Sequence, residues 1–235
     1  MARVHNIPVH YHTMESNEMQ RWIDEGCELF FVAEYSHKLP VLADDRFKGV
    51  NIHSSRLPQG RSYYPIECAM ERQLDETGVT LHKLASTIDS GDILAQRSYP
   101  IEQNDDSIYI YLKSAQNALE MTKKVMADFE KAWRTATPQQ QSQPYWKRPS
   151  AELMTINHNM TVAQAKEIYR RYNKMSVVII NGRLYYIDGF STGNVIIESG
   201  DKNIIFVHKK RILYGLKDGH VRLDIDAMPA EKRVI

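Results

Sequence analysis

Two continuous apolar stretches in the first quarter of the chain constrain the fold most strongly. They are ELFFVAEY, residues 28–35, and FKGVNIHSS, residues 47–55. Apolar runs without regular polar alternation are typical of strands that are buried on both faces, as parallel strands are in an α/β sheet. We therefore expect an α/β domain with a mainly parallel sheet.

Local patterns predict the other elements of this domain. Residues 6–10, NIPVH, are expected to form a strand, and residues 15–26 a short helix that ends at Gly26. A helix with Pro65 in its first turn leads to two further strands, GVTLHKL at 78–84 and DILAQRSYPI at 92–101.

The clearest helix of the sequence follows Asn104. Its apolar residues recur at spacings of three, four or seven, which predicts that they form one stripe packed on the sheet. The stripe consists of Ile108, Leu112, Ala115, Leu119, Met126, Phe129 and Trp133.

A change of composition predicts a second domain. Residues 138–150 are rich in Gln, Ser and Pro, so we expect a linker between a catalytic domain, 1–137, and a small C-terminal domain, 151–235. In the latter, Thr161 is expected to cap the helix VAQAKEIYRRY, and Asn181-Gly182 predicts a type I′ hairpin turn. The short runs NVIIES, NIIFVH, RILYGL and HVRLDI indicate an α+β domain with an antiparallel sheet or barrel.

The charge and the cysteine count restrict the partners and the compartment. Thirty basic residues oppose 29 acidic ones, so no global field attracts RNA or a membrane surface, although HKKR at 208–211 is a local basic patch. Cys27 and Cys68 have no metal-binding spacing, the N-terminus has no signal-peptide pattern, and no long apolar run is present. We expect a cytoplasmic protein with reduced thiols, no metal and no membrane contact.

Three polar residues stand where strands and loops of such a sheet meet. Asn51 and His53 are two positions apart, so their side chains share one face of a strand, and Asp89 lies in the loop STIDSGDILAQ. An Asn amide and a protonated His can stabilise the oxyanion of a tetrahedral intermediate, while an Asp orients the His and helps to move the proton. This set favours acyl transfer directly to an amine, without a Ser or Cys nucleophile.

Each of these residues also has a purely structural interpretation. Asn51 and Asp89 occur in sequence contexts typical of turns, and His53 is then a buried histidine with satisfied hydrogen bonds. His82, in GVTLHKL, can equally be a strand residue with no chemical role. Arg61 can be a surface charge or a ligand for an acidic acceptor.

The ordered set NIHSSRLPQGRSYYP, ETGVTLHKL and STIDSGDILAQ resembles the catalytic domain of the formyltransferases that use 10-formyltetrahydrofolate. The hallmark of that family is Asn-x-His with a Leu-Pro loop, a Gly-Val-Thr strand and an Asp-x-Gly loop. The resemblance covers roughly residues 5–135 and implies a Rossmann-like fold. It also implies that Asn51, His53 and Asp89 are the catalytic trio.

The same resemblance implies a position for the folate. Its pterin ring would lie against the loop after ELFFVAEYSHKLP and the loop before Asp89. The candidate lining residues are Tyr35, His37, Leu39 and Leu84. Residues after 150 resemble, more weakly, the small C-terminal domain of methionyl-tRNA formyltransferase and of some sugar formyltransferases.

Two features depart from the family pattern. The match starts almost at Met1, so we expect a domain that lacks the usual first strand, helix and strand. An uncovered sheet edge would favour pairing with another chain, and we therefore expect a homodimer. Ser54 stands where the family usually has Pro, and RSYYP replaces an Arg-Gly sequence, so acceptor recognition is expected to differ.

The expected function is transfer of a formyl group from 10-formyltetrahydrofolate to a primary amine. We favour a nucleotide-linked amino sugar over methionyl-tRNA because the net charge of +1 offers little attraction to a phosphate backbone. Tyr63 and Tyr64, close to Arg61 in sequence, provide aromatic surface for a base or sugar. A non-catalytic binding module of the same fold is the alternative, and retention of the catalytic trio argues against it.

Overall fold

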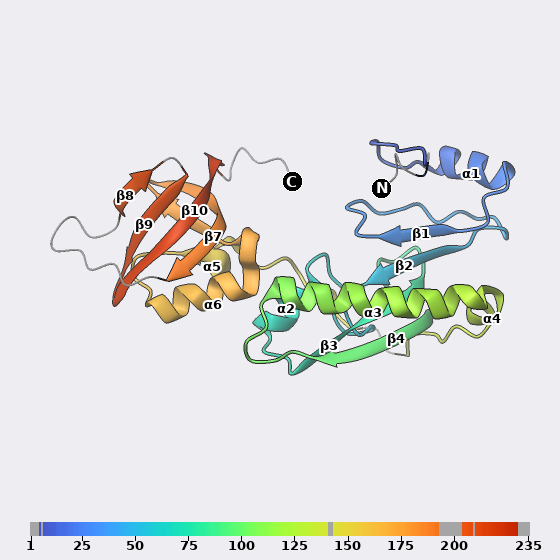
Figure 1. Cartoon of the computed structure of the whole chain (residues 1–235). Helices are drawn as coiled ribbons and strands as arrows, with labels where there is room; N and C mark the ends of the chain where they lie inside the picture. Colours follow the sequence, from blue (N-terminus) through green and yellow to red (C-terminus); the bar gives the residue numbers. More distant parts are fainter. Residues whose placement is uncertain (1–4, 6, 141–142, 193–203, 209, 230–235) are drawn as a thin grey trace. The chain divides into compact units, whose positions relative to one another are not determined.

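The computed structural model (Figure 1) describes residues 5, 7–140, 143–192, 204–208 and 210–229. The chain divides into two compact units. The first comprises Met1–Arg61, Gly78–Ser98 and Asn117–Pro144, and the second comprises Ser62–Thr77, Tyr99–Gln116 and Tyr145–Ile235. The units interleave along the sequence, and the domain limits expected at 137 and 150 stay a prediction.

The first sheet has four strands in the order β1-β2-β3-β4. They are β1 (Phe30–Ala33), β2 (Gly49–His53), β3 (Glu76–Lys83) and β4 (Ile93–Pro100). Strand β1 is parallel to β2, whereas β2 is antiparallel to β3. The predicted α/β class is confirmed, and the sheet is mixed rather than mainly parallel.

The helix and strand predicted near the N-terminus differ in outcome. Helix α1 (Ser16–Asp24) forms as expected, because Met19 and Ile23 lie on one face and are buried with Phe30 of β1. The strand predicted at 6–10 is wrong for residues 7–10, which have no strand pairing. An apolar run becomes a strand only when a partner edge accepts its hydrogen bonds.

Helix α2 (Pro65–Glu71) begins with Pro65, as predicted, because a missing N–H costs nothing in the first turn. It is followed in sequence by the strands β3 and β4 and then by α3 (Ser107–Ala127) and the short α4 (Phe129–Arg134). Within the described ranges, no helix has the length and hydropathy needed to span a bilayer.

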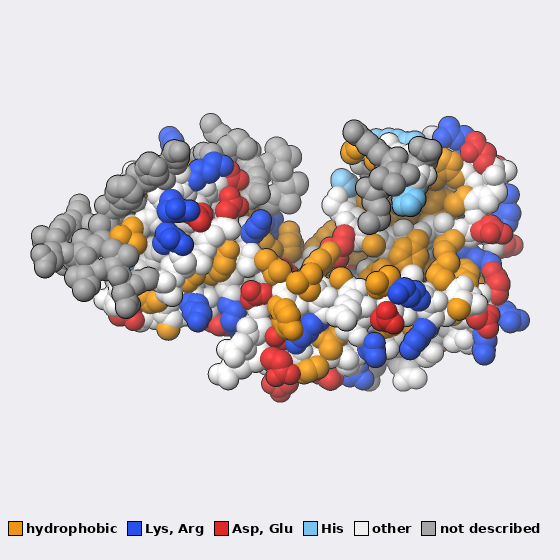
Figure 2. Space-filling view, in the orientation of Figure 1, with side chains coloured by type: hydrophobic (Ala, Val, Ile, Leu, Met, Phe, Trp, Pro, Cys, Tyr) orange, Lys and Arg blue, Asp and Glu red, His pale blue; other side chains and the backbone are white. Residues whose placement is uncertain are grey.

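The packing face predicted for α3 is wrong. Several large side chains of the predicted stripe are exposed, namely Ile108, Leu112, Leu119 and Met126. The buried residues form a second stripe at helical spacing, Ile110, Ser114, Ala118, Met121 and Val125. Because this stripe contains small residues, it allows closer packing than the predicted one. Figure 2 shows apolar side chains at the surface in the region of α3.

The second sheet has the strand order β5-β6-β7-β10-β9-β8. Its strands are β5 (Thr155–Ile156), β6 (Val177–Ile180), β7 (Arg183–Thr192), β8 (Ile204–His208), β9 (Arg211–Leu216) and β10 (Gly219–Pro229). The pairs are antiparallel except β5 with β6. The antiparallel sheet expected here is confirmed, and the predicted strand NVIIES lies outside the described residues.

In the C-terminal part of the chain, the helix cap and the hairpin turn predicted from the sequence are both present. The short helix α5 (Ala151–Met154) precedes β5, and α6 (Val162–Tyr172) leads into a 3₁₀ turn, η2 (Asn173–Met175). Thr161 caps α6 through a capping box with Gln164. Asn181 and Gly182 both have positive φ, 49° and 75°, as a type I′ turn requires.

Candidate active site

The register between β2 and β3 places the candidate residues together. Asn51 pairs with His82 across the two strands, and His53 pairs with Thr80. Because side chains two apart in a strand share a face, Asn51, His53 and His82 lie on the same side of the sheet. His53 and His82 are buried, with ring centroids 6.4 Å apart.

Asp89 completes this group from the loop between β3 and β4. Its carboxylate is 8% exposed, and Oδ1 lies 3.7 Å from His53 Nδ1 and 3.7 Å from His82 Nε2. A buried carboxylate is costly unless donors or positive charge face it, which the His53 ring can provide when it is protonated. Asn51, His53, His82 and Asp89 are called the polar cluster below.

His82 orients the amide of Asn51. Burial lowers the pKa of His82 to about 4, so this ring is neutral at pH 7. Its Nδ1 is 2.8 Å from the carbonyl oxygen of Lys83 and carries the proton, which leaves Nε2 to accept from Asn51 Nδ2 at 3.2 Å. One N–H of the Asn51 amide is therefore hydrogen-bonded to His82. This bond fixes the plane of the amide and so the direction of its other N–H. The sequence left His82 without a role because its partner depends on strand register.

His53 is hydrogen-bonded at one ring nitrogen and faces the Asp89 carboxylate with the other. Nε2 donates to the carbonyl oxygen of Gly60 at 2.8 Å, and Nδ1 faces Asp89. Gly60 has φ of 82°, a conformation that favours glycine, so the chain can turn its carbonyl toward the ring. The imidazole therefore has a fixed plane, as a group that stabilises or transfers charge requires.

The loop that carries Gly60 is fixed by hydrogen bonds to β3 and β4. Thr80 Oγ1 donates to the carbonyl oxygen of Ser55 at 2.7 Å and accepts from the backbone N–H of Leu57 at 3.2 Å. The amide of Gln96 donates to the carbonyl oxygen of Leu57 at 2.7 Å and to Thr80 Oγ1 at 2.9 Å. Neither Thr80 nor Gln96 was singled out from the sequence.

The backbone at Asp89 is held in a sparsely populated conformation. Its φ is 55°, and the Gln139 amide donates to the carbonyl oxygens of Asp89 and Gly91 at 3.0 and 2.8 Å. A Cβ at Gly91 would lie 1.9 Å from the carbonyl oxygen of Lys83, so this position requires glycine. Strain that is maintained by surrounding contacts is characteristic of functional sites.

Arg61, a candidate acceptor ligand, contacts this same loop. Its Nε and Nη2 donate to the carbonyl oxygen of Ile88 at 3.0 and 2.7 Å, immediately before Asp89. The guanidinium therefore holds the loop that carries the carboxylate. This contact favours a positioning role for Arg61, which the sequence did not indicate.

The two loops expected to line the folate are joined. The Lys38 ammonium donates to the carbonyl oxygen of Ser86 at 2.5 Å, which links the loop after β1 to the loop before Asp89. Tyr35 and His37 lie in the first loop with ring centroids 5.6 Å apart. The Tyr35 hydroxyl accepts from the backbone N–H of Met14, and His37 is exposed.

The two leucines of the predicted folate site are half-buried. Leu39 packs against the apolar group of Met19, Ile23 and Phe30. Leu84 follows β3, and its backbone N–H donates to the carbonyl oxygen of Gly49 at 2.8 Å. Both leucines therefore belong to the loops or strand ends of the first unit.

The two candidate tyrosines belong to the second unit. Tyr63 is 54% exposed, and its backbone N–H donates to the Tyr145 hydroxyl at 3.1 Å. Tyr64 packs against Cys68, Ala69 and Trp146. Tyr63 thus offers an accessible ring, whereas Tyr64 contributes to a core.

The sequence of this chain is similar to those of known proteins. The family model described as formyl transferase matches residues 8–126. A curated relative, the methionyl-tRNA formyltransferase of Lactiplantibacillus plantarum, is 33% identical over 147 residues, or 61% of this chain and 46% of the relative. The chain therefore spans about half the length of this relative.

Two solved structures share the fold. HypX from Aquifex aeolicus in complex with tetrahydrofolic acid has a TM-score of 0.68 at 18% identity, over 83% of this chain and 35% of HypX. A sugar N-formyltransferase from Shewanella sp. FDAARGOS_354 has a TM-score of 0.60 at 20% identity, over 78% of this chain and 76% of that one.

Proposed function

The chain belongs to the formyl transferase family, and we propose that it transfers a formyl group from 10-formyltetrahydrofolate to a primary amine. The observation that carries the proposal is the polar cluster, in which Asn51 and His53 share a face of β2 and the buried Asp89 carboxylate faces His53 at 3.7 Å. A hydrogen-bond donor, an imidazole and a carboxylate are the groups that acyl transfer to an amine needs.

In the proposed reaction the amine nitrogen attacks the formyl carbon, and a C–N bond forms while negative charge develops on the formyl oxygen. The N–H of the Asn51 amide that is not bonded to His82 donates a hydrogen bond to that oxygen, and the positive charge of protonated His53 stabilises it. The bond from the formyl carbon to the folate nitrogen then breaks, and the proton lost by the amine passes to that nitrogen. Asp89 orients His53 and assists the proton transfer, while His82 keeps the Asn51 amide oriented.

We assign folate contacts to Tyr35, His37, Leu39 and Leu84. Tyr35, His37 and Leu39 lie in the loop after β1, and Leu84 follows β3 at the start of the loop before Asp89. The hydrogen bond from Lys38 to the carbonyl oxygen of Ser86 joins these two loops and so supports the assignment. The solved complex of HypX with tetrahydrofolic acid shares the fold, which is consistent with a folate donor.

For the acceptor we propose a nucleotide-linked amino sugar. The net charge of +1 gives little attraction to a phosphate backbone, and the exposed Tyr63 ring is suited to stacking on a base or sugar. Methionyl-tRNA is the second candidate, and the observation in its favour is the 33% identity to a methionyl-tRNA formyltransferase.

A side-by-side assay separates the two acceptors. The chain is incubated with 10-formyltetrahydrofolate and either a nucleoside diphosphate-linked 4-amino sugar or methionyl-tRNA, and kcat/KM is measured for each. We expect the higher kcat/KM with the nucleotide sugar, and Tyr63→Ala should raise its KM more than Tyr145→Phe does. Higher kcat/KM with methionyl-tRNA would overturn the assignment. Binding of the sugar nucleotide without turnover would instead support a non-catalytic binding module.

We also propose self-association through β1. In the described part of the chain β1 pairs with β2 on one side, no strand pairs with its other edge, and Phe31 is 41% exposed. Exposed strand edges favour pairing with a second chain. Light scattering at micromolar concentration should give the mass of a dimer, and a monomer would contradict the proposal.

A further inference from the structure

A group of side chains of the types that ligate metals lies outside the polar cluster, before and within α1. His10, His12 and Glu18 each offer one ligand atom, and these atoms all lie within 4.8 Å of one another. The two imidazoles are exposed, and the carboxylate is half-buried. We propose that these three side chains bind a divalent transition-metal ion, specifically Zn²⁺.

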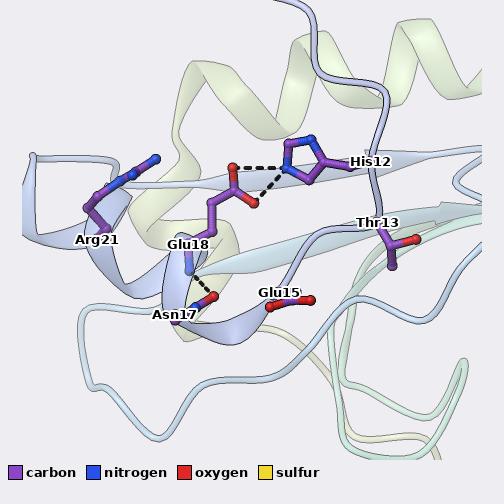
Figure 3. Close-up of a pocket in the computed structure, with 6 residues that line it drawn as sticks. All are labelled: His12, Thr13, Glu15, Asn17, Glu18 and Arg21. Atoms are coloured by element: carbon purple, nitrogen blue, oxygen red, sulfur yellow. Dashed lines mark hydrogen bonds and ion pairs between the residues drawn. The ribbon is translucent and has the colours of Figure 1, made fainter.

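The geometry of the three residues follows from their local structure. His10 and His12 are two apart in a segment without helix or strand, and their ring centroids are 5.5 Å apart. Glu18 lies in the first turn of α1 and directs its carboxylate at His12, with Oε2 2.8 Å and Oε1 3.1 Å from Nε2. Figure 3 shows the His12 ring and the Glu18 carboxylate facing each other.

Packing on both sides of the site reduces the movement that binding requires. Trp22 of α1 lies with its ring 5.8 Å from the His10 ring and 6.3 Å from the ring of Phe30. Beyond His12, the backbone N–H of Met14 donates to the Tyr35 hydroxyl at 3.0 Å. The segment that carries the imidazoles is thus fixed at two points on the first unit.

The ligand types select the metal. Two imidazoles and a carboxylate suit Zn²⁺ and related transition metals, whereas Mg²⁺ and Ca²⁺ prefer oxygen ligands throughout. Tetrahedral Zn²⁺ with bonds of about 2.0–2.1 Å places its ligand atoms about 3.3 Å apart, so these side chains need to close by no more than about 1.5 Å. Rotamer changes of exposed histidines supply such a movement.

The surroundings leave room for a fourth ligand. An open hollow of about 610 Å³ is lined by His12, Thr13, Glu15, Asn17, Glu18 and Arg21. Figure 3 shows these side chains around the His12–Glu18 pair. A water molecule on the metal would face this hollow and complete a tetrahedral set of three protein ligands and one solvent ligand.

Zinc titration against a chromophoric chelator, at about pH 7.5 and with a chain free of any polyhistidine tag, tests the site. We expect saturable binding of one Zn²⁺ per chain, weakened at least tenfold by each of His10→Ala, His12→Ala and Glu18→Gln. His158→Ala, at an exposed histidine elsewhere in the chain, should leave the affinity unchanged. Affinity that none of the three variants alters would overturn the proposal.

Two further measurements keep this test decisive. Circular dichroism checks that each variant is folded. Glu18→Gln preserves the shape of the side chain, so its Zn²⁺ affinity still tests the site if His12→Ala does not fold. Substitution by Co²⁺ should give the visible spectrum of a four-coordinate site with nitrogen and oxygen ligands. A thiolate charge-transfer band would place the metal on Cys27 or Cys68 instead and would overturn the assignment.

Discussion

His82 Nε2 accepts a hydrogen bond from Asn51 Nδ2 at 3.2 Å across the β2–β3 pair. A neutral His82 is required for this contact, because a protonated ring would present a donor to a donor. The orientation of the proposed oxyanion-binding amide therefore depends on the protonation state of a buried neighbour. This dependence connects the stability of the site to pH.

The first prediction concerns that dependence. The pKa of His82 is about 4 in the folded chain against 6.5 ordinarily, because of burial. At a pH between these two pKa values, His82 is protonated in the unfolded chain and neutral in the folded chain. The free energy of unfolding therefore falls by about 3 kcal/mol as the pH drops from about 6.5 to about 4. Above about pH 6.5 both states are neutral and this contribution is constant. Urea unfolding across this range should show a smaller fall for His82→Gln.

A matched variant controls for histidines in general. His158 is exposed, and His158→Gln should retain the wild-type dependence on pH. If His82→Gln lost stability on acidification as steeply as wild type, the burial of a neutral His82 would not be the cause.

The second prediction concerns the loop of Asp89. Gly91→Ala should lower the free energy of unfolding by more than about 2 kcal/mol, since its Cβ would overlap the carbonyl oxygen of Lys83 at 1.9 Å. Gly219→Ala is the control, because its Cβ would meet only Val162 Cγ2 at 3.1 Å and should cost less than about 1 kcal/mol. Equal losses in chemical denaturation would argue against a constrained loop.

The third prediction separates the two roles open to Arg61. Because Nε and Nη2 of Arg61 hold the carbonyl oxygen of Ile88, Arg61→Ala should loosen the Asp89 loop and lower kcat about tenfold or more. The KM for the amine acceptor should change little. Steady-state kinetics with the acceptor varied distinguish the outcomes, and a large rise in KM at unchanged kcat would assign Arg61 to acceptor binding.

The fourth prediction concerns the hairpin between β6 and β7. Gly182 has φ of 75°, which costs an L-residue about 1–2 kcal/mol. Gly182→Ala should therefore lower the free energy of unfolding by about that amount, measured by urea denaturation. Asn181→Gly, at φ of 49°, should be tolerated with a change below about 1 kcal/mol. Tolerance of alanine at Gly182 would contradict the type I′ assignment.

Sequence patterns predicted the elements that local chemistry determines. The predicted Thr161 cap and Asn181-Gly182 turn depend on residues three or fewer apart, and both are present, the cap as a capping box with Gln164. The two apolar runs correctly predicted β1 and β2, and each of these strands has a paired neighbour in the sheet. The strand predicted at 6–10 did not form at residues 7–10, because strand formation depends on a partner that the local pattern does not contain.

Periodicity alone did not identify the buried face of α3. The helix has apolar residues on two faces, and the face with the larger side chains, such as Leu112 and Leu119, is the exposed one. Ser114 and Ala118 are buried instead. Which stripe is buried depends on the shape of the surface opposite, and a helical period does not encode that shape.

The candidate site was predictable in part. Strand alternation places Asn51 and His53 on one face, and the structure brings Asp89 to within 3.7 Å of His53 Nδ1. The contact of Asn51 with His82 depends on the register between two strands separated by a helix and two loops. That register, and the hold of Arg61 on the loop of Asp89, are consequences of tertiary structure.

The central claim is that Asn51, His53 and Asp89 catalyse formyl transfer as one unit. The most direct test measures single-turnover release of tetrahydrofolate from 10-formyltetrahydrofolate in the presence of the amine acceptor, for wild type, Asn51→Ala, His53→Ala, Asp89→Asn and the control Asn159→Ala. We predict losses of about 10²–10⁴-fold for the three cluster variants, folate binding within about threefold of wild type, and unchanged rates for Asn159→Ala. Wild-type rates in folded cluster variants would contradict the account.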